Sequence, residues 1–585
     1  MAISLNDIGL RNKIDQASGG HDYLDRYQSL LEGKDVRHLA IILGTRPVAI
    51  ANTFAEFLPD ATVTAISFAA VDDYARLRPN VRMQPVRDLI GVHRALASSG
   101  PYDVLIEDSP NRKSQKREIF RQLFPYVGDA GIYIAEDLHA SYIPSLLDDD
   151  KEDLWQLVSR LLVIKGSGGK APAGASADDK ELARAVHRIE FDGKLLAISS
   201  KGHKACKLRH GEANSILQAR YGETWGRVVS RTEAAVVTSE ALVTGNNPDL
   251  AAQKFPNPIH VPELYVREYH DVVALPRQVL LKDSLALPDT FRLGLIGRLG
   301  NTALNALNHY FAWSPLPDAE PVSLAGQYYY LDLEYSRHFG HFMTEAVPRL
   351  YAWDEVKAKN PDLKILISSP TAEGNLLPYQ SALLEAYGIG ESDIHIFKGP
   401  VRLASLFAPM PLFHNMKYVH PMLRETFERL GKNLDRGRSP FGDRIFVSRR
   451  PGMWRECLNM EELETLFVRH GFRVIYPEDL SLQEQATAFA NAKVAAGYIG
   501  SGLYSAMFSA QPMDIIGFVN TAYVATNEYF ITTVMNHRLH NFWCDDIKGN
   551  RDVDSAGRPL GATNWDYEFN FERDGARLEQ ILNDL

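Results

Sequence analysis

The stretch "KVAAGYIGSGLYSAMFS" (493–509) has the order of a buried strand, a glycine turn and a helix. The same alternation continues on both sides of it, with strands predicted at 444–450, 472–480 and 514–519 and helices at 460–471 and 481–492. The last of these helices begins with a capping box, Ser481 and Glu484. Strands that alternate with helices are typical of a parallel α/β sheet.

The first part of the chain repeats this pattern. Short apolar runs that end in small or acidic residues predict strands at 37–44, 62–68, 103–108 and 131–137, and 185–202 predicts a hairpin turning at Asp192-Gly193. Further strands are predicted at 363–369, 393–399 and 403–409. The fold class is therefore α/β, with a doubly wound parallel sheet first and two α/β halves after it. A ligand would bind at the carboxyl ends of their strands.

Composition restricts the class of protein. The chain has 585 residues, 45% hydrophobic and 23% charged, as in an ordinary soluble protein of more than one domain. Its net charge of −10 argues against a nucleic-acid partner. The three cysteines, Cys206, Cys457 and Cys544, match no metal spacing and fit a reduced, cytoplasmic setting. No apolar run is long enough to cross a membrane, while peripheral membrane contact stays open.

A polar stripe marks the segment "HFGHFMTEAVPRLYAW" (338–353). If the segment is a helix, its apolar residues form one stripe, and four polar residues form another about 100° round the axis: His338, His341, Glu345 and Arg349. Pro348 predicts a kink or a restart. The polar stripe is either part of a site or a solvated edge with a Glu345–Arg349 ion pair. The spacing is not that of a zinc protease, so we expect no metal here.

Two other segments carry groups suited to phosphate. Arg449, Arg450 and Arg455 follow a predicted strand, and guanidinium groups match phosphate oxygens. The alternative is that they pair with nearby glutamates at the surface. The turn Gly500–Gly502 stands between a strand and a helix, where backbone N–H groups can reach a phosphate.

Taken in order, these segments resemble glycosyltransferase family 61. The match covers roughly 260–545 and rests on three motifs and a glycine turn: His341, Phe342, Glu345, Pro348, Arg349 and Leu350; Ser448, Arg449, Arg455, Asn459, Glu461 and Leu463; Leu480, Ser481, Glu484 and Gln485; and Ile499 to Leu503. The family's glycine turn usually begins with histidine, where this chain has Ile499.

The resemblance implies a GT-B-like fold and an inverting transfer from a nucleotide sugar that requires no metal or other cofactor. Such a transfer needs a base for the acceptor hydroxyl and positive groups for the leaving diphosphate. Glu345 is the base candidate, with His341 as an alternative or an orienting partner. The donor-binding candidates are Arg449, Arg450, Arg455, Asn459, Glu484, Gln485, Gly500, Ser501 and Gly502. His338, Arg349 and His420 are candidates for acceptor binding or structural support.

The first part of the chain, at 102–142 and 187–202, resembles Rossmann-type methyltransferases of the macrocin O-methyltransferase and cephalosporin hydroxylase group. Its cofactor end departs from their pattern, because Ile42 and Ser67 stand where acidic residues are expected, and Arg46 and Pro47 where small ones are. We therefore expect S-adenosylmethionine to be an unlikely cofactor and the domain to be degenerate. The strand-end residues Asp108, Glu136, Asp137 and His139 are either remnants of a metal site or caps of a scaffold.

These observations predict four segments: a methyltransferase-like domain (1–205), a helical linker (206–256), and two GT-B-like halves for the acceptor (257–435) and the nucleotide sugar (436–585). The expected function is a cytoplasmic glycosyltransferase, a hexosyl- or pentosyltransferase that acts on a glycan or glycolipid precursor of a surface polysaccharide. The alternatives are a bifunctional glycosyltransferase and sugar O-methyltransferase, and a non-catalytic sugar-binding assembly protein.

Overall fold

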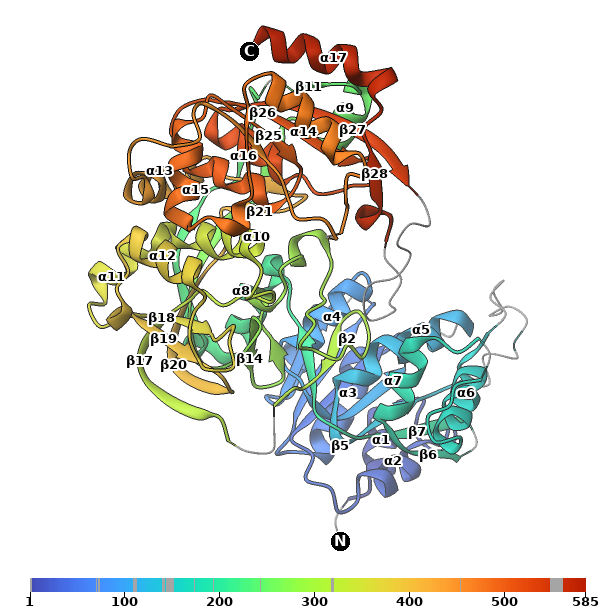
Figure 1. The fold of residues 1–585 in the computed structure, drawn as a ribbon. Helices are drawn as coiled ribbons and strands as arrows, with labels where there is room; N and C mark the ends of the chain where they lie inside the picture. Colours follow the sequence, from blue (N-terminus) through green and yellow to red (C-terminus); the bar gives the residue numbers. More distant parts are fainter. Residues whose placement is uncertain are drawn as a thin grey trace. The chain divides into compact units, whose positions relative to one another are not determined.

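The computed structural model describes residues 3–69, 71, 74–108, 113–138, 143, 152–172, 174–192, 194–241, 243–316, 320–452, 454–547 and 561–585. The chain forms two compact units (Figure 1). Unit 1 comprises residues 1–225 and 279–320, and unit 2 comprises residues 226–278 and 321–585. Both units are therefore discontinuous in sequence.

Unit 1 contains a seven-stranded sheet with the order β3-β2-β1-β4-β5-β7-β6. Its strands are β1 (His38–Leu43), β2 (Thr62–Ser67), β3 (Val81–Pro85), β4 (Tyr102–Asp108), β5 (Val127–Ala135), β6 (Val186–Asp192) and β7 (Leu195–Ser200). The first five are parallel, and the hairpin β6–β7 adds antiparallel strands at one edge. This strand order is that of a Rossmann-type sheet. The predicted strands and hairpin of this region are confirmed.

Helices cover the sheet of unit 1. They are α1 (Leu5–Asn12), α2 (Leu24–Leu31), α3 (Pro47–Phe57), α4 (Leu89–Ala97), α5 (Lys113–Leu123), α6 (Leu154–Gly166), α7 (Ala177–Ala185) and α8 (His210–Tyr221). Tyr27 of α2 and Phe54 of α3 pack on Ile41 of β1, so the first three helices share one apolar core with the sheet. Four short strands complete the unit in the order β16-β8-β15-β14: β16 (Phe311–Trp313), β8 (Lys204–Lys207), β15 (Leu285–Ala286) and β14 (Val279–Lys282).

Unit 2 has two sheets. The first has the order β11-β27-β26-β25-β23-β24, all parallel, and β28 joins β27 in an antiparallel pair. Its strands are β11 (Val243–Gly245), β23 (Arg444–Val447), β24 (Arg473–Ile475), β25 (Val494–Tyr498), β26 (Asp514–Asn520), β27 (Arg538–Ile547) and β28 (Asp566–Glu568). Phe467 of α14 (Met460–Arg469) and Leu578 of α17 (Phe571–Asp584) pack in one core with Phe518 of this sheet.

The second sheet of unit 2 contains the consecutive strands β13, β20, β17, β18 and β19, and β9 pairs with β13. These strands are β9 (Gly226–Thr232), β13 (Leu264–Leu275), β17 (Val322–Tyr330), β18 (Lys364–Ser368), β19 (Ile394–Phe397) and β20 (Val401–Pro409). Two small pairs are formed by β10 (Ala235–Val237) with β12 (Ile259–Val261) and by β21 (Phe413–His414) with β22 (Tyr418–Val419).

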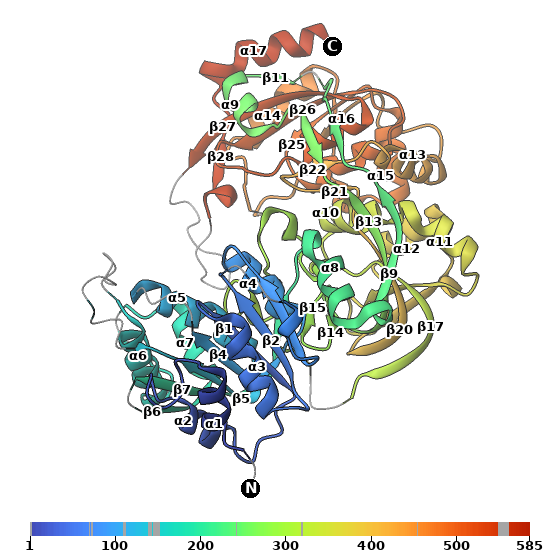
Figure 2. The ribbon, with the colours of Figure 1, turned by 180° about the vertical axis from the view of Figure 1, so that it is seen from behind.

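The helices of unit 2 lie around these sheets (Figures 1 and 2). They are α9 (Pro248–Lys254), α10 (Phe339–His341), α11 (Trp353–Lys359), α12 (Pro378–Tyr387), α13 (Leu423–Leu434), α14 (Met460–Arg469), α15 (Leu482–Asn491), α16 (Asn527–Met535) and α17 (Phe571–Asp584). Both views place α10 between the yellow elements that include α12 and the orange ones that include β21. The predicted capping box of α15 is confirmed, with reciprocal bonds between Ser481 and Glu484.

Two expectations differ from the structure. The segment 206–256, expected to be a helical linker, contains strands β9, β10 and β11 besides helices α8 and α9. β9 forms because the run "GRVVSRT" pairs along β13, a long-range contact that outweighs local preference. The structure also divides the chain at 225/226, 278/279 and 320/321, whereas the expected divisions lay at 205/206, 256/257 and 435/436.

No helix within the described ranges has both the length and the apolar character needed to cross a membrane.

Candidate functional site in unit 2

The segment predicted as one helix changes its winding three times. It begins as α10, continues as a π-helix over Phe342–Ala346 and a 3-10 helix over Val347–Ala352, and ends as α11. Pro348 has no N–H to donate, which agrees with the predicted break. π-Helical turns are rare and are often found at functional sites. Glu345 lies within this π-turn.

His341 and Glu345 form a pair on this segment. His341 Nδ1 and Glu345 Oε1 are 2.8 Å apart, and the two side chains are 26% and 13% exposed. The ring of Tyr335 stacks on His341 with 4.9 Å between centroids. His338 Nδ1 accepts the backbone N–H of His341 at 3.3 Å, so this histidine caps the helix. The pair is held in a defined geometry and still reaches solvent.

Arg349 has a different partner from the one in the ion-pair interpretation. Its guanidinium is buried and donates from Nη1 to the carbonyl oxygen of Asp332 at 2.8 Å. The Asp332 carboxylate in turn accepts from the backbone N–H groups of Gln278 and Ser368. Arg349 therefore links the opening segment to the neighbouring sheet, and Glu345 is paired with His341.

The glycine turn lies against two of the three arginines. Gly500 has φ +146°, and a Cβ at this position would lie 3.2 Å from Arg449 Nη2 and 3.4 Å from Arg455 Nη2. Arg449 Nη2 also donates to the carbonyl oxygens of Tyr498 and Ile499, at 3.2 and 3.0 Å. Parallel strands bring these groups together, because Arg449 follows β23 and Gly500 follows β25 at the same edge of the sheet. The helix after the turn, Ser501–Phe508, is 3-10 rather than α.

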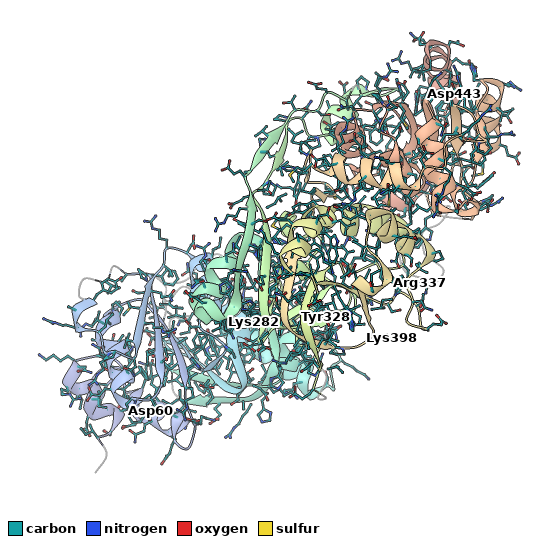
Figure 3. The ribbon with its side chains drawn as sticks, turned by 90° about the vertical axis from the view of Figure 1, so that its left-hand side faces the viewer. Asp60, Lys282, Tyr328, Arg337, Lys398 and Asp443 are labelled. Atoms are coloured by element: carbon teal, nitrogen blue, oxygen red, sulfur yellow. The ribbon has the colours of Figure 1, made fainter. Side chains whose placement is uncertain are left out.

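A close backbone approach joins the turn to the opening segment. A Cβ on Gly340 would lie 2.8 Å from Ser501 Cβ and 3.0 Å from Tyr504 Cε2. Gly340 lies one position before His341, in the segment that follows Arg337, which is labelled in Figure 3. The His341–Glu345 pair and the arginine-flanked turn therefore belong to one region of unit 2.

Three predicted donor-binding side chains are engaged with the protein itself. Arg450 is 56% exposed and forms an ion pair with Asp479 at the surface. Asn459 donates to the carbonyl oxygen of Phe569 at 2.8 Å and accepts its N–H at 3.0 Å. Gln485 donates to the carbonyl of Pro477 at 2.8 Å and accepts from Ser505 of the 3-10 helix at 3.1 Å.

The two remaining candidates have local roles. Glu484 is exposed and completes the cap of α15 with Ser481. His420 is buried, and its Nδ1 accepts the backbone N–H of Met422 at 3.1 Å. Burial lowers the pKa of His420, so this histidine is neutral at pH 7.

Sequence reasoning missed a carboxylate at the glycine turn. Glu528 of α16 is 5% exposed, and its Oε1 has no hydrogen-bond partner in the part of the chain that the structure describes. Burial raises the pKa of Glu528 to about 7, against the opposing influence of Arg455 and the Gly500 N–H. Arg455 also lies over the ring of Tyr523, 4.6 Å from its centroid. A buried acid beside two arginines is a signal of a site, but α16 carries no motif that points to it.

In unit 1, the three acids among the four predicted strand-end residues lie together: Asp108, Glu136 and Asp137. Tyr23 Oη donates to Asp137 at 2.8 Å, and Gln16 Nε2 donates to Asp108 at 3.1 Å. Burial, with the charges of Glu136 and Asp137, raises the pKa of Asp108 to about 9, and burial raises that of Glu136 to about 8. His139 lies outside the described residues. Within those residues no group of three or more His, Cys, Asp or Glu has a metal-binding arrangement.

Comparison with known proteins finds different relatives for the N-terminal region and for residues 339–516. Residues 339–516 match the family model of glycosyltransferase 61. This range contains the His341–Glu345 pair, the arginine segment and the glycine turn.

The N-terminal region is similar to curated O-methyltransferases. A tetracenomycin 3'-O-methyltransferase of Streptomyces olivaceus is 36% identical over 63 residues, 11% of this chain and 16% of that protein. Demethylmacrocin O-methyltransferase of Streptomyces fradiae is 38% identical over 64 residues, 10% of this chain and 16% of that protein. The chain therefore matches about a sixth of the length of these relatives.

Solved methyltransferases also align with part of the chain. MycE from the mycinamycin pathway, with Mg, SAH and mycinamycin VI, has 19% identity and a TM-score of 0.29, covering 34% of this chain and 54% of its own. TomG from Streptomyces achromogenes, in complex with SAM, has 16% identity and a TM-score of 0.23. The alignment covers 34% of this chain and 88% of the TomG chain.

The expectation that S-adenosylmethionine is an unlikely cofactor is contradicted. Both curated relatives of the N-terminal region are O-methyltransferases, and they are 36% and 38% identical to it over 63 and 64 residues. The expectation gave too much weight to Ile42 and Ser67, which stand where acids were expected, and to Arg46 and Pro47, which stand where small residues were expected. Backbone groups and acids at other strand ends, such as Asp108, can also bind hydroxyls, so these departures do not decide binding.

The sequence-based resemblances are thus confirmed: residues 339–516 match the family model of glycosyltransferase 61, and the N-terminal region is similar to curated O-methyltransferases.

Proposed function

We propose that unit 2 is an inverting glycosyltransferase with a GT-B-like arrangement. It transfers a hexosyl or pentosyl group from a nucleotide sugar to a hydroxyl of a glycan or glycolipid acceptor, as in the synthesis of a surface polysaccharide. The proposal rests on the match of residues 339–516 to glycosyltransferase 61 and on the geometry of the site.

One structural observation carries the proposal. Gly340 packs against Ser501, and Gly500 packs against Arg449 and Arg455. A proton acceptor on the first segment therefore lies in the same region as the positive groups on the second. Transfer to a hydroxyl needs both, because the acceptor must lose a proton while the diphosphate leaves with additional charge.

In the proposed reaction the acceptor oxygen attacks the anomeric carbon, and the bond from that carbon to the diphosphate oxygen breaks. The acceptor proton passes to the His341–Glu345 pair. Glu345 takes it directly, or holds Nδ1–H of His341 so that Nε2 takes it. The Gly500 turn, Arg449 and Arg455 stabilise the departing diphosphate, to which guanidinium groups donate paired hydrogen bonds.

A donor screen tests this function. Purified protein is incubated with individual nucleotide sugars and a panel of sugar acceptors, and release of nucleoside diphosphate is measured. We expect release with one class of donor, dependent on acceptor and unaffected by chelators. A protein that binds nucleotide sugars but releases no diphosphate with any acceptor would support the assembly-protein alternative.

We propose a second function for unit 1, which is binding of S-adenosylmethionine for O-methylation. The similarity to two curated O-methyltransferases and the Rossmann-type strand order support it. Asp108 and Glu136 lie at the carboxyl edge of this sheet, where ligands of such folds bind. Calorimetric titration with S-adenosylhomocysteine tests it. Binding that is lost in Asp108→Ala supports the proposal, and no heat up to millimolar ligand contradicts it.

A further inference from the structure

A cavity lies in unit 1, at the edge of the sheet opposite to Asp108 and Glu136. Its volume is about 860 Å³, within the range of small-molecule sites. Pro101, which precedes β4, and Val127, the first residue of β5, both line it. It therefore lies at the amino ends of the parallel strands, whereas Asp108 and Glu136 lie at their carboxyl ends.

Cations without carboxylate partners face this cavity. Lys201, Lys204 and Arg220 line it, and none of them lies within 4.0 Å of a carboxylate oxygen in the described part of the chain. Lys204 Nζ donates to Ser200 Oγ at 2.7 Å and to the Gly202 carbonyl at 3.0 Å, and Arg220 Nη2 donates to Ser284 Oγ at 2.8 Å. All three acceptors are neutral.

Lys204 is the most constrained of these cations. It is 7% exposed, and burial lowers its pKa to about 8. An ammonium group has three donors, and the bonds to Ser200 and Gly202 account for two of them. A buried cation is costly unless an anion accompanies it. Two carboxylates also line the cavity, and both are exposed: Asp129, which accepts the Gly202 N–H at 2.6 Å, and Asp283.

Aromatic side chains form another part of the wall. Trp313 packs on Gly202, where an added Cβ would lie 2.7 Å from Trp313 Cζ3. Its indole N–H is fixed by Glu181 at 2.6 Å, and Arg184 lies over its ring at 4.5 Å. Phe311 packs edge-on against Tyr126. Flat rings beside cations suit a ligand with both a ring and an anionic group.

We propose that this cavity binds a phosphorylated small molecule with a ring, such as a nucleotide or a sugar phosphate, whose phosphate is held by Lys201, Lys204 and Arg220. Three cations match the two negative charges of a phosphate monoester better than the single charge of a carboxylate. The site is separate from the carboxyl edge of unit 1, and its lining includes no residue of the glycine turn.

The test uses full-length protein carrying Arg449→Met, so that nucleotide binding at the glycine turn is weakened. Uridine monophosphate, uridine, benzoate and inorganic phosphate are titrated by calorimetry. We expect uridine monophosphate to bind at least ten-fold more tightly than uridine and than benzoate. Lys201→Ala and Arg220→Gln should each weaken it about ten-fold or more, the usual scale for a charged hydrogen bond. Lys194→Ala, an exposed lysine of the same unit outside the cavity, should leave it unchanged.

Three results would overturn the proposal. The first is equal affinity for uridine monophosphate in the cavity variants and in the Lys194→Ala control. The second is the absence of binding by any phosphate probe at millimolar concentration. The third is tighter binding of benzoate than of uridine monophosphate, which would reject phosphate in favour of a carboxylate ligand. Lys201 is exposed, so Lys201→Ala leaves folding intact and keeps the comparison valid if a variant at Arg220 unfolds.

Discussion

Ile499 lies directly over Gly517: a Cβ added to Gly517 would be 2.3 Å from Ile499 Cδ1 and 2.9 Å from Cγ1. Ile499 follows β25, and Gly517 is on the adjacent strand β26. Ile499 is 3% exposed, so the side chain at the position of the family histidine fills a buried space. The identity of residue 499 is thus coupled to the size of residue 517.

This contact predicts a measurable coupling. Gly517→Ala should lower the free energy of unfolding by about 1–3 kcal/mol, because the added methyl overpacks the core. Ile499→Val in the same chain removes Cδ1 and should recover part of that loss. Urea denaturation of both single variants and the double variant measures the coupling. Gly575→Ala, where the nearest atoms lie 3.9 Å away, is the control. Strict additivity of the two substitutions would contradict the contact.

Removing the proton acceptor should stop transfer without unfolding the protein. We expect Glu345→Gln to lower turnover about 100-fold or more, the scale for loss of a general base. His341→Ala should have an effect of similar size, since the two side chains act as a pair. Glu355→Gln, an exposed glutamate of α11, is the matched control. Turnover is measured as diphosphate release, with thermal melting to verify the fold; turnover equal to wild type in Glu345→Gln would exclude the base assignment.

The two arginines at the glycine turn should dominate diphosphate binding. Arg449→Met and Arg455→Met are each expected to weaken binding of the matching nucleoside diphosphate by about 1.5–3 kcal/mol, the range for hydrogen bonds to charged groups. Arg450→Met should have a smaller effect, because this arginine is exposed and paired with Asp479. Calorimetric titration compares the three variants. Equal losses in all of them would point to general electrostatic attraction rather than to the turn.

The glycine at position 500 is required for two separable reasons. Gly500→Ala forces a side chain onto φ +146° and places its Cβ 3.2 Å from Arg449. We expect it to lower stability by about 1–3 kcal/mol and also to weaken diphosphate binding. Gly452→Ala, with φ +92° and no atom within 4 Å, carries the backbone cost alone. If both variants bind diphosphate equally well, the contact with the arginines is not part of the donor site.

Glu528 should make diphosphate binding depend on pH. Its pKa of about 7 means that it gains a negative charge beside Arg455 as the pH rises from 6 to 8. That charge repels a diphosphate, so affinity should fall over this interval in the wild type. Glu528→Gln should remove this part of the pH dependence and leave only the titration of the ligand itself. Identical pH profiles for the two proteins would show that Glu528 does not face the bound diphosphate.

The same residue predicts a change in stability with a defined sign. The folded-state pKa of Glu528 lies above the usual value of 4.5, so the folded protein holds this proton more tightly than the unfolded chain. Stability from this group is present below about pH 4.5 and is lost as pH rises through 7. Relative to wild type, Glu528→Gln should therefore gain free energy of unfolding between these values. A constant difference across the window would contradict the assigned pKa.

The sequence predicted the regular elements well where the signal was local. The apolar runs of β1, β2, β4 and β25 and the capping box of α15 depend on neighbouring residues alone. The pair His341–Glu345 follows from i,i+4 spacing. Periodicity did not reveal the π-turn over Phe342–Ala346, because one inserted residue barely shifts the apolar stripe.

Contacts between residues that are far apart in the sequence could not be predicted from local patterns. Glu528 is 28 positions from Gly500 and reaches it only because β26 and α16 fold back along the sheet edge. The grouping of residues into two discontinuous units depends on the same kind of long-range contact. Cys206 pairs with Phe311 and with Leu285, and such contacts leave no trace in local composition.

The pairing of β8 with β15 and β16 has a consequence for folding during synthesis. β8 acquires its neighbours β15 and β16 only from residues 285–313, after the chain has passed through 226–278. During synthesis on the ribosome, β8 of unit 1 therefore has an unpaired edge until this later segment has been translated. β9, β10 and β11 likewise stay unpaired until their partner strands β13, β12 and β27 have been made. A break anywhere in 206–278 would leave both nascent units with unpaired strands, so fragments divided there are expected to aggregate instead of folding independently.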